Sequence, residues 1–249
     1  KMFPEVKNEA DDYGCLTKDI LGVEIPITGV VADQQSALFA QACLTPWSVK
    51  STNGTGSFVT FNLGDACVKG KGPYASIVAW KLPDQVRFMA EGFLPTAGAA
   101  LDWLMNRMHL IQSFDEINEI MARTPDSGGV YFSPALNGLR APLNDAAARA
   151  AFLGISGGTT REQCVRAVVE SIGYANAQII KDVCSNFGIR SLDSIKISGG
   201  VARESTLGQM IADITGTKVE QPTSLEASAI GAAQFAGIYT GAYSLKDIP

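Results

Sequence analysis

Hydrophobic and polar positions fall into short runs through the first third of the chain. A β-branched run at residues 27–31 predicts a strand, and the spacing of apolar residues over 33–44 predicts a helix directly after it. Residues 1–26 before this strand are polar and predict an irregular lead-in. Farther on, β-branched and aromatic runs broken by glycines predict antiparallel strands, expected at 49–53, 57–63, 75–80 and 85–93.

Helical periodicity dominates the rest of the chain. Residues 160–186 predict the longest helix, because Thr160 and Gln163 form a Thr-x-x-Gln capping signature and Gly188 supplies a C-terminal cap. Shorter helices are expected at 96–111, 115–123, 204–215 and 226–240, and strands at 130–133, 194–198 and 218–220. Strands and helices that alternate after an antiparallel start predict an α/β fold with a mixed sheet and helices on its faces, and argue against a sandwich or a bundle.

Composition narrows the possible chemistry. The 249 residues, 46% of them hydrophobic, suffice for one large domain or two small ones. The 20 Lys and Arg against 25 Asp and Glu give a net charge of −5, which argues against a nucleic-acid groove. The single histidine, His109, excludes zinc sites that need two or three imidazoles, and we expect no metal-ligand cluster of that kind.

Cysteine usage and hydropathy indicate the compartment. The five cysteines are scattered without a C-x-x-C pair, so a reducing, cytoplasmic environment is expected rather than a disulfide framework. The first residues lack the apolar region of a signal peptide. The uncharged stretch 227–245 is long enough to span a membrane, but its many small residues favour a buried helix without a membrane span.

Three common nucleotide and hydrolase motifs are absent: the P-loop, the Rossmann glycine fingerprint and the nucleophile elbow. A glycine-rich turn, Gly54-Thr55-Gly56, remains between two predicted strands. Its backbone N–H groups and the Thr55 hydroxyl could hold phosphate, or the turn could simply close a hairpin.

Two further signals lie where predicted strands meet predicted helices. Gly199 and Gly200 follow a strand and precede a helix, a place where ligands rest on open α/β sheets, although two glycines can also only turn the chain. Asp33, beside Gln34, could take a proton from a hydroxyl or could cap the helix that follows it. We expect His109, on a helix near Trp103, to be a surface or partly buried packing residue.

The order of these signals carries a resemblance to a known family. Seven segments resemble successive segments of the FGGY carbohydrate kinases, in their glycerol kinase branch, and cover almost the whole chain. They are IPITGVVADQQSALFAQ (25–41), NGTGSF (53–58), AGAALDWL (97–104), PALNGLRAPLND (134–145), RAVVESI (166–172), SGGVAR (198–203) and SAIGAA (228–233).

The resemblance implies a ribonuclease-H-like, actin-like ATPase fold in which two α/β domains close over ATP and a polyol or sugar. It assigns residues 27–249 to the carboxyl-terminal nucleotide-binding domain, with 27–45 at the junction with an amino-terminal domain and 1–26 as lead-in. It further implies an ATP-dependent kinase that uses Mg²⁺ and acts on a small polyol, glycerol first.

Roles for individual residues follow from the same resemblance. Asp33 matches the base that takes the proton of the substrate hydroxyl, Gln34 a hydroxyl ligand, and Phe58 an aromatic that packs on the carbon face of the substrate. The positions that match the ATP site are Gly54, Thr55, Gly56, Gly98, Asp102, Gly199, Gly200 and Glu204.

Three residues depart from the pattern of glycerol kinases. Asp102 stands where a glutamine is common, Glu204 where many have asparagine, and Arg140 where an aromatic is usual. Two additional carboxylates near a tetra-anionic nucleotide weaken its binding unless they point away or bind Mg²⁺.

The Asp-x-Gly-Thr hairpin that opens the amino-terminal domain of the family has no counterpart in the chain. We therefore expect the 249 residues alone not to phosphorylate a substrate. Two other functions stay open: a kinase of pentuloses or other sugars, and a non-catalytic actin-like module that binds nucleotide or a partner. The sequence also leaves a homo-oligomer open.

Overall fold

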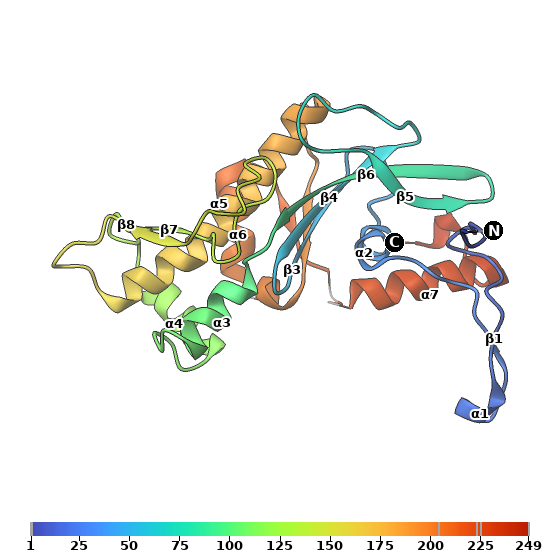
Figure 1. Ribbon diagram of the computed structural model, residues 1–249, viewed down its shortest axis with the longest axis horizontal. Helices are drawn as coiled ribbons and strands as arrows, with labels where there is room; N and C mark the ends of the chain where they lie inside the picture. The colour runs from blue at the N-terminus through green and yellow to red at the C-terminus, as the bar shows by residue number, and fades with distance from the viewer. Residues whose placement is uncertain (1, 204, 223, 225, 249) are drawn as a thin grey trace.

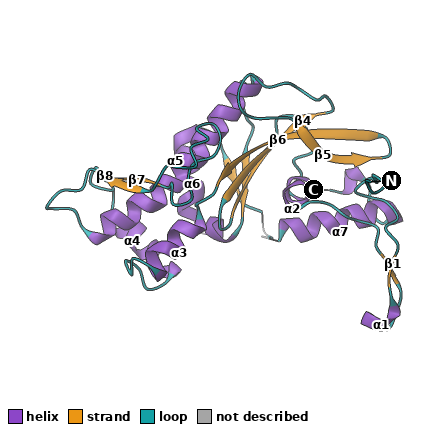
Figure 2. Cartoon of the chain, in the orientation of Figure 1, coloured by secondary structure: helices purple, strands orange, loops and turns teal. Residues whose placement is uncertain are grey.

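A six-stranded mixed sheet forms the centre of the protein (Figures 1 and 2). The structure, a computed structural model, describes residues 2–203, 205–222, 224 and 226–248. The strands lie in the order β10-β9-β3-β4-β6-β5, with β9 parallel to both β10 and β3 and antiparallel pairing from β3 to β5. Their bounds are β3 Val49–Asn53, β4 Ser57–Gly64, β5 Ile77–Leu82, β6 Gln85–Leu94, β9 Ile195–Ser198 and β10 Val219–Glu220.

Helices cover both faces of this sheet, which confirms the predicted α/β architecture (Figure 1). One face packs on α3 (Gly98–Asn106), α5 (Arg161–Phe187) and α6 (Ser205–Thr215), and α4 (Phe114–Arg123) packs outside α5. On the other face lie α2 (Asp33–Ala40) and α7 (Ala227–Thr240), which pack against each other.

Each face has its own apolar core. Beneath α5 the core joins Val59 and Phe61 of β4 to Val168 and Ile172 of the helix. Beneath α2 it centres on Phe39, whose ring lies 5.2 Å from Trp80 and 4.2 Å from Phe235. Alternate residues of β3 and β4 therefore face two different sets of helices.

The ends of α5 are specified by sequence, as predicted. Thr160 and Gln163 form a reciprocal capping box at its N-terminus. Gly188 follows its last residue at φ 72°, a left-handed conformation that glycine adopts without steric cost.

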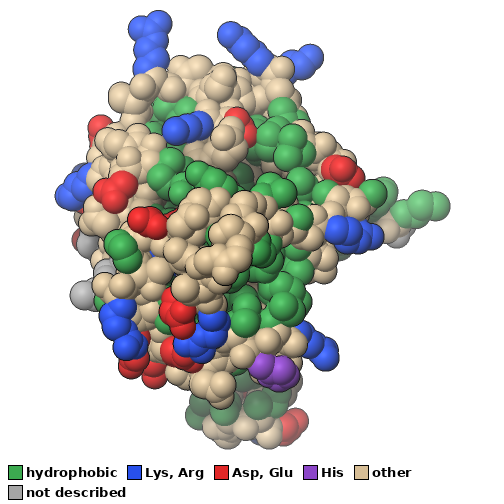
Figure 3. All heavy atoms as spheres, turned by 90° about the vertical axis from the view of Figure 1, so that its left-hand side faces the viewer, with side chains coloured by type: hydrophobic (Ala, Val, Ile, Leu, Met, Phe, Trp, Pro, Cys, Tyr) green, Lys and Arg blue, Asp and Glu red, His purple; other side chains and the backbone are tan. Residues whose placement is uncertain are grey.

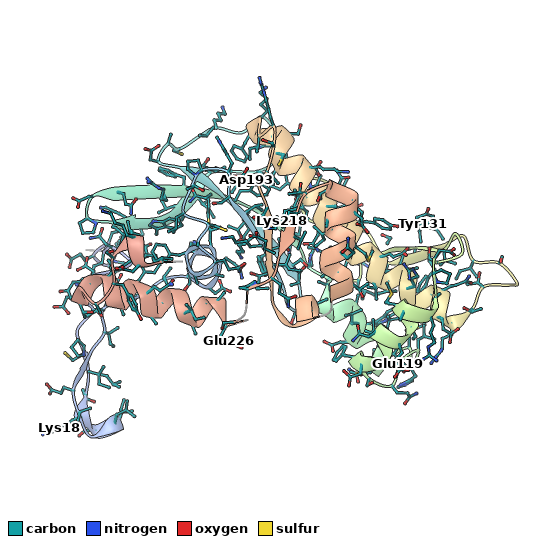
Figure 4. All side chains as sticks on the ribbon, turned by 180° about the vertical axis from the view of Figure 1, so that it is seen from behind. Lys18, Glu119, Tyr131, Asp193, Lys218 and Glu226 are labelled. Atoms are coloured by element: carbon teal, nitrogen blue, oxygen red, sulfur yellow. The ribbon has the colours of Figure 1, made fainter. Side chains whose placement is uncertain are left out.

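Two predictions for the first 31 residues are wrong. The expected irregular lead-in contains a narrow arm, β1 (Cys15–Leu16), α1 (Lys18–Leu21) and β2 (Ile25–Pro26), whose tip carries Lys18 in Figure 4. No strand forms at 27–31. This segment lies outside the central sheet, and its backbone forms hydrogen bonds with the backbone of the lead-in. The Ile27 N–H donates to the Gly14 carbonyl at 2.8 Å.

Several predicted helices are shorter in the structure. The helix expected at 33–44 ends at Ala40, because Ala42 adopts φ 52°. The helix expected at 96–111 ends at Asn106, which places His109 in an exposed turn at φ 53° rather than on a helix. In the stretch 227–245 the α-helix ends at Thr240, and a separate short 3-10 helix begins at Leu245. In the part of the chain that the structure describes, no helix is long and apolar enough to cross a membrane.

A small hairpin extends the far end of the molecule. It pairs β7 (Tyr131–Ser133) with β8 (Ala151–Leu153), of which the sequence pattern predicted only the first. Figure 4 shows Tyr131 and Glu119 at this end, opposite the arm. Figure 3 shows hydrophobic side chains gathered on the face at this end.

Candidate active site

A cavity of about 510 Å³ lies on the α5 side of the sheet. Apolar side chains dominate its lining, with polar and acidic side chains among them. Its lining comprises Gly54, Thr55, Gly98, Leu101, Asp102, Phe114, Asp115, Ile117, Asn118, Met121, Val169, Ile172, Gly200, Val201, Thr206 and Leu207. A mainly apolar pocket with few polar groups suits a flat ring joined to polar substituents.

The β3–β4 hairpin ends in a turn, residues 54–56, that is fixed to the N-terminus of α3. The Ala97 and Ala99 N–H groups both donate to the Thr55 carbonyl at 3.0 Å, and the Gly98 N–H donates to the Gly54 carbonyl at 2.9 Å. The first amides of α3 are thus satisfied by the 54–56 turn, since α3 has no side-chain cap. A Cβ on Gly98 would lie 2.6 Å from the Gly54 oxygen, which explains glycine there.

Gly199 and Gly200 contribute differently. Gly199 adopts φ +94°, and a Cβ on it would lie 2.4 Å from the Asn53 oxygen, so it allows β9 to end against β3. A Cβ on Gly200 or on Gly54 would meet no atom within 4 Å. Since both residues line the cavity, their missing side chains leave its wall open for a ligand.

Asp33 lies on the opposite face of the sheet, exposed at the start of α2. It is the first residue of the helix, and Ala32 occupies the N-cap position without a side-chain bond, so the capping interpretation of Asp33 is wrong. Its carboxylate accepts the Gln34 backbone N–H at 2.8 Å and the Gln34 side-chain Nε2–H at 3.2 Å. Both carboxylate oxygens keep further lone pairs for a substrate hydroxyl.

A buried lysine continues this contact into the sheet. Lys50 of β3 is fully buried, and its ammonium donates to Gln34 Oε1 and, at 3.0 Å, to Thr52 Oγ1. Burial lowers the pKa of Lys50 to about 8, against the opposing effects of Glu91, Cys43 and Asp33. Burial likewise raises the pKa of Glu91, although the charge of Lys50 opposes that shift.

Phe58 shares this face of the sheet. It pairs with Thr52 across β3–β4 and with Phe93 across β4–β6, and its ring stacks on Phe93 at 4.3 Å. Lys50 donates hydrogen bonds to both Thr52 and Gln34, and Thr52 is the register partner of Phe58. Phe58, Gln34 and its neighbour Asp33 therefore lie on the same face of the sheet. The half-buried phenyl ring offers an apolar contact there.

The structure therefore separates the predicted residues into two groups joined by the 54–56 turn. Gly54, Thr55, Gly98, Asp102 and Gly200 line the cavity, and Asp33, Gln34 and Phe58 lie on the α2 face. Gly56 packs against β6 instead, where a Cβ would lie 2.6 Å from the Leu94 oxygen. Glu204 lies outside the described residues.

Sequence reasoning missed Lys50 and Glu91. A lysine inside a strand normally indicates an exposed position, but here the period of two places Lys50 beneath α2 while Val49 and Ser51 face α5. Alternation of Val49, Lys50 and Ser51 was the only available signal. Among the described residues, no group of three His, Cys, Asp or Glu side chains could hold a metal ion.

Comparison with known proteins shows which family the chain resembles. The model of the C-terminal domain of the FGGY family of carbohydrate kinases matches residues 49–239. "Glycerol kinase 2" of Thermotoga maritima is 40% identical over 240 residues, which are 96% of this chain and 48% of that protein. A glycerol kinase of Geobacter sp. is 40% identical over 248 residues, 99% of this chain and 50% of that protein.

Solved structures share the fold. The Plasmodium falciparum glycerol kinase with ADP matches 98% of this chain and 49% of its own at a TM-score of 0.89 and 32% identity. A xylulose kinase from Lactobacillus acidophilus matches 96% of this chain and 50% of its own at a TM-score of 0.79 and 19% identity, which bears on fold alone. The chain spans about half the length of the curated relatives it matches.

Proposed function

Because the chain belongs to the FGGY family of carbohydrate kinases, we propose that it is the nucleotide-binding half of an ATP-dependent glycerol kinase. The observation that carries this proposal is the position of the 54–56 turn. Gly54 and Thr55 of this turn line the 510 Å³ cavity, and the turn joins the two strands that carry Thr52 and Phe58 on the face of Asp33 and Gln34. A phosphate chain that reaches from the cavity across this turn would meet a hydroxyl held at Asp33.

In this proposal the α5 face of the sheet binds the nucleotide, and the α2 face binds the substrate. Leu101, Met121 and Ile172 supply apolar contact for the nucleotide base, and the open wall at Gly54 and Gly200 lets the nucleotide approach the backbone. Thr55 is exposed and offers its hydroxyl to phosphate oxygens. Asp102 and Asp115 line the same cavity and suit the ribose hydroxyls, which donate hydrogen bonds to carboxylates.

The chemical step places Asp33 as the base. It takes the proton of the substrate hydroxyl as that oxygen bonds to the γ-phosphorus, and the bond from phosphorus to the bridging oxygen breaks to release ADP. Gln34 holds the carboxylate and offers a second N–H to a substrate oxygen, and Phe58 covers the carbon face of the polyol. Mg²⁺ would enter with the nucleotide, bound by its phosphates and by residues beyond this chain.

The proposal includes an amino-terminal domain that completes the site, in a cytoplasmic enzyme with reduced cysteines. It retains residues 27–249 as the nucleotide-binding domain, with 27–45 at the junction. The supporting observations are the half-length match to the relatives and five free cysteines. Gly56 and Gly199 act from behind the site by fixing the turn and the end of β9.

A substrate screen with the full-length protein tests this function. We expect glycerol to give the highest rate of ADP release, because Asp33 and Gln34 offer hydrogen-bonding groups for polyol hydroxyls and the Phe58 ring offers an apolar contact on the same face of the sheet. High activity on a ketopentose with none on glycerol would favour the sugar-kinase alternative. Failure of the full-length protein to bind ATP in calorimetry would contradict a kinase altogether and favour a partner-binding module.

A further inference from the structure

Lys50 is unusual because a fully buried ammonium group normally needs a carboxylate beside it. Its side chain is 0% exposed in the middle of β3. Among the described residues, no carboxylate oxygen lies within 4.0 Å of its Nζ. Its two acceptors are neutral, Gln34 Oε1 and Thr52 Oγ1. Desolvation of such a cation is unfavourable, so its presence calls for a role that a neutral side chain would not fill.

The first contact of Lys50 determines how the Gln34 amide is oriented. An ammonium group has only donors, so the oxygen of the amide must face Lys50 and its nitrogen must face away. That nitrogen donates to Asp33 Oδ2 at 3.2 Å, and a carboxylate can only accept. Donor and acceptor requirements agree at both ends of Gln34, which leaves the amide one orientation. The second Nε2–H remains available for another acceptor.

Charged and titratable groups around Lys50 come from every neighbouring element. Asp33 lies on α2, Cys43 follows that helix, Glu91 lies on β6, and Lys196 of β9 is the register partner of Lys50. The Lys196 ammonium donates to the Gln41 carbonyl at 2.5 Å and, among the described residues, makes no hydrogen bond to Gln34 or Asp33. Only Lys50 of the two lysines is therefore connected to Asp33 through hydrogen bonds.

We propose that Lys50 is a positioning residue for phosphoryl transfer, which fixes the Gln34 amide so that it holds the Asp33 carboxylate toward the substrate hydroxyl. This inference rests on the proposed function and adds to it. Lys50 is fully buried, where a substrate does not reach its ammonium group, so it acts through Gln34. Without it, nothing fixes the Gln34 oxygen, and the amide can turn its nitrogen away from Asp33.

The test uses the full-length protein with Lys50→Met, which keeps the length and apolar stem of the side chain and removes the donor. We expect kcat for glycerol to fall about ten-fold or more, since general-base positioning contributes that much, with KM for ATP unchanged. Lys50→Gln retains an N–H donor and should recover part of the loss. Lys196→Met is the matched control on the next strand and should keep kcat within about two-fold.

A double-mutant cycle separates positioning from structure. In a Gln34→Met background, Lys50→Met should cause no further loss of kcat, because the hydrogen bonds from Lys50 through Gln34 to Asp33 are already broken. An unchanged kcat in Lys50→Met alone, or full additivity in the cycle, would overturn the inference. Loss of folding in both Lys50 variants while Lys196→Met folds would also overturn it, because Lys50 would then be structural.

Failure of this inference is distinguishable from failure of the proposed function. If the unmodified full-length protein transfers no phosphate to glycerol, the function fails before any variant is compared. If it does and Lys50→Met is as active, only the role of Lys50 is lost.

Discussion

The free energy of unfolding should depend on pH because Lys50 is buried, and replacing Lys50 should remove that part of the dependence. Burial lowers the pKa of Lys50 to about 8, from 10.5 for an ordinary lysine. Between these values the unfolded chain binds more protons than the folded chain, so the free energy of unfolding rises with pH. A pKa that falls from 10.5 to about 8 corresponds to a contribution on the order of 3 kcal/mol. Below pH 8 this unfavourable contribution is fully present, and above pH 10.5 it is gone.

Urea unfolding of the 249-residue chain and of its Lys50→Met variant, at intervals from pH 7 to 10.5, measures this contribution. Other groups, including Cys43 with a pKa raised to about 11 by burial, titrate in both proteins and largely cancel in the difference. We expect the variant to gain stability relative to the unmodified chain at pH 7 and to lose most of that gain by pH 10.5. Parallel curves across the whole range would refute the assignment of a buried, protonated Lys50.

Three further predictions concern the cavity and the chain as a unit. Gly199→Ala should lower the free energy of unfolding in urea by about 2 kcal/mol or more, since it combines φ +94° with a Cβ 2.4 Å from the Asn53 oxygen. The control Gly188→Ala, with φ +72° and open space around the Cβ, should lower it by about 1 kcal/mol. Equal losses would contradict the close approach of Gly199 to Asn53. Gly200→Val should weaken ADP binding about ten-fold in calorimetry without lowering stability, because its side chain enters the cavity wall, and unchanged affinity would exclude this cavity as the nucleotide site. The 249-residue chain alone should release no ADP in response to glycerol, and measurable turnover would show that no other domain is needed.

Local signals made much of the fold predictable. The capping box of Thr160 and Gln163, the cap at Gly188 and the glycine turn after β3 each specify backbone geometry within a few residues. The strand at 27–31 was mispredicted because its β-branched residues bond the lead-in, a contact between distant segments that composition does not reveal. The length of α2 was overestimated because the left-handed conformation of Ala42 is not encoded by the apolar spacing.

Part of the candidate site was also predictable from local sequence motifs. Motif order brought Asp33, the 54–56 turn and Gly200 to attention, and the structure places the last two on one cavity. Lys50 escaped notice because its importance depends on strand register and on α2 above it, which only the folded chain displays. His109 was expected on a helix and lies in a turn, because α3 ends at Asn106, before the end of the helix predicted over 96–111.

Asp33 is proposed here as the base of a glycerol kinase whose nucleotide lies across the 54–56 turn. Steady-state kinetics and ADP calorimetry of the full-length protein with Asp33→Asn test it most directly. Asparagine keeps the size of the side chain but cannot take a proton, so we expect kcat to fall by about 100-fold or more while ADP affinity and melting temperature stay unchanged. A kcat within about two-fold of the unmodified enzyme would exclude Asp33 as the base, because its carboxylate would then serve only the start of α2.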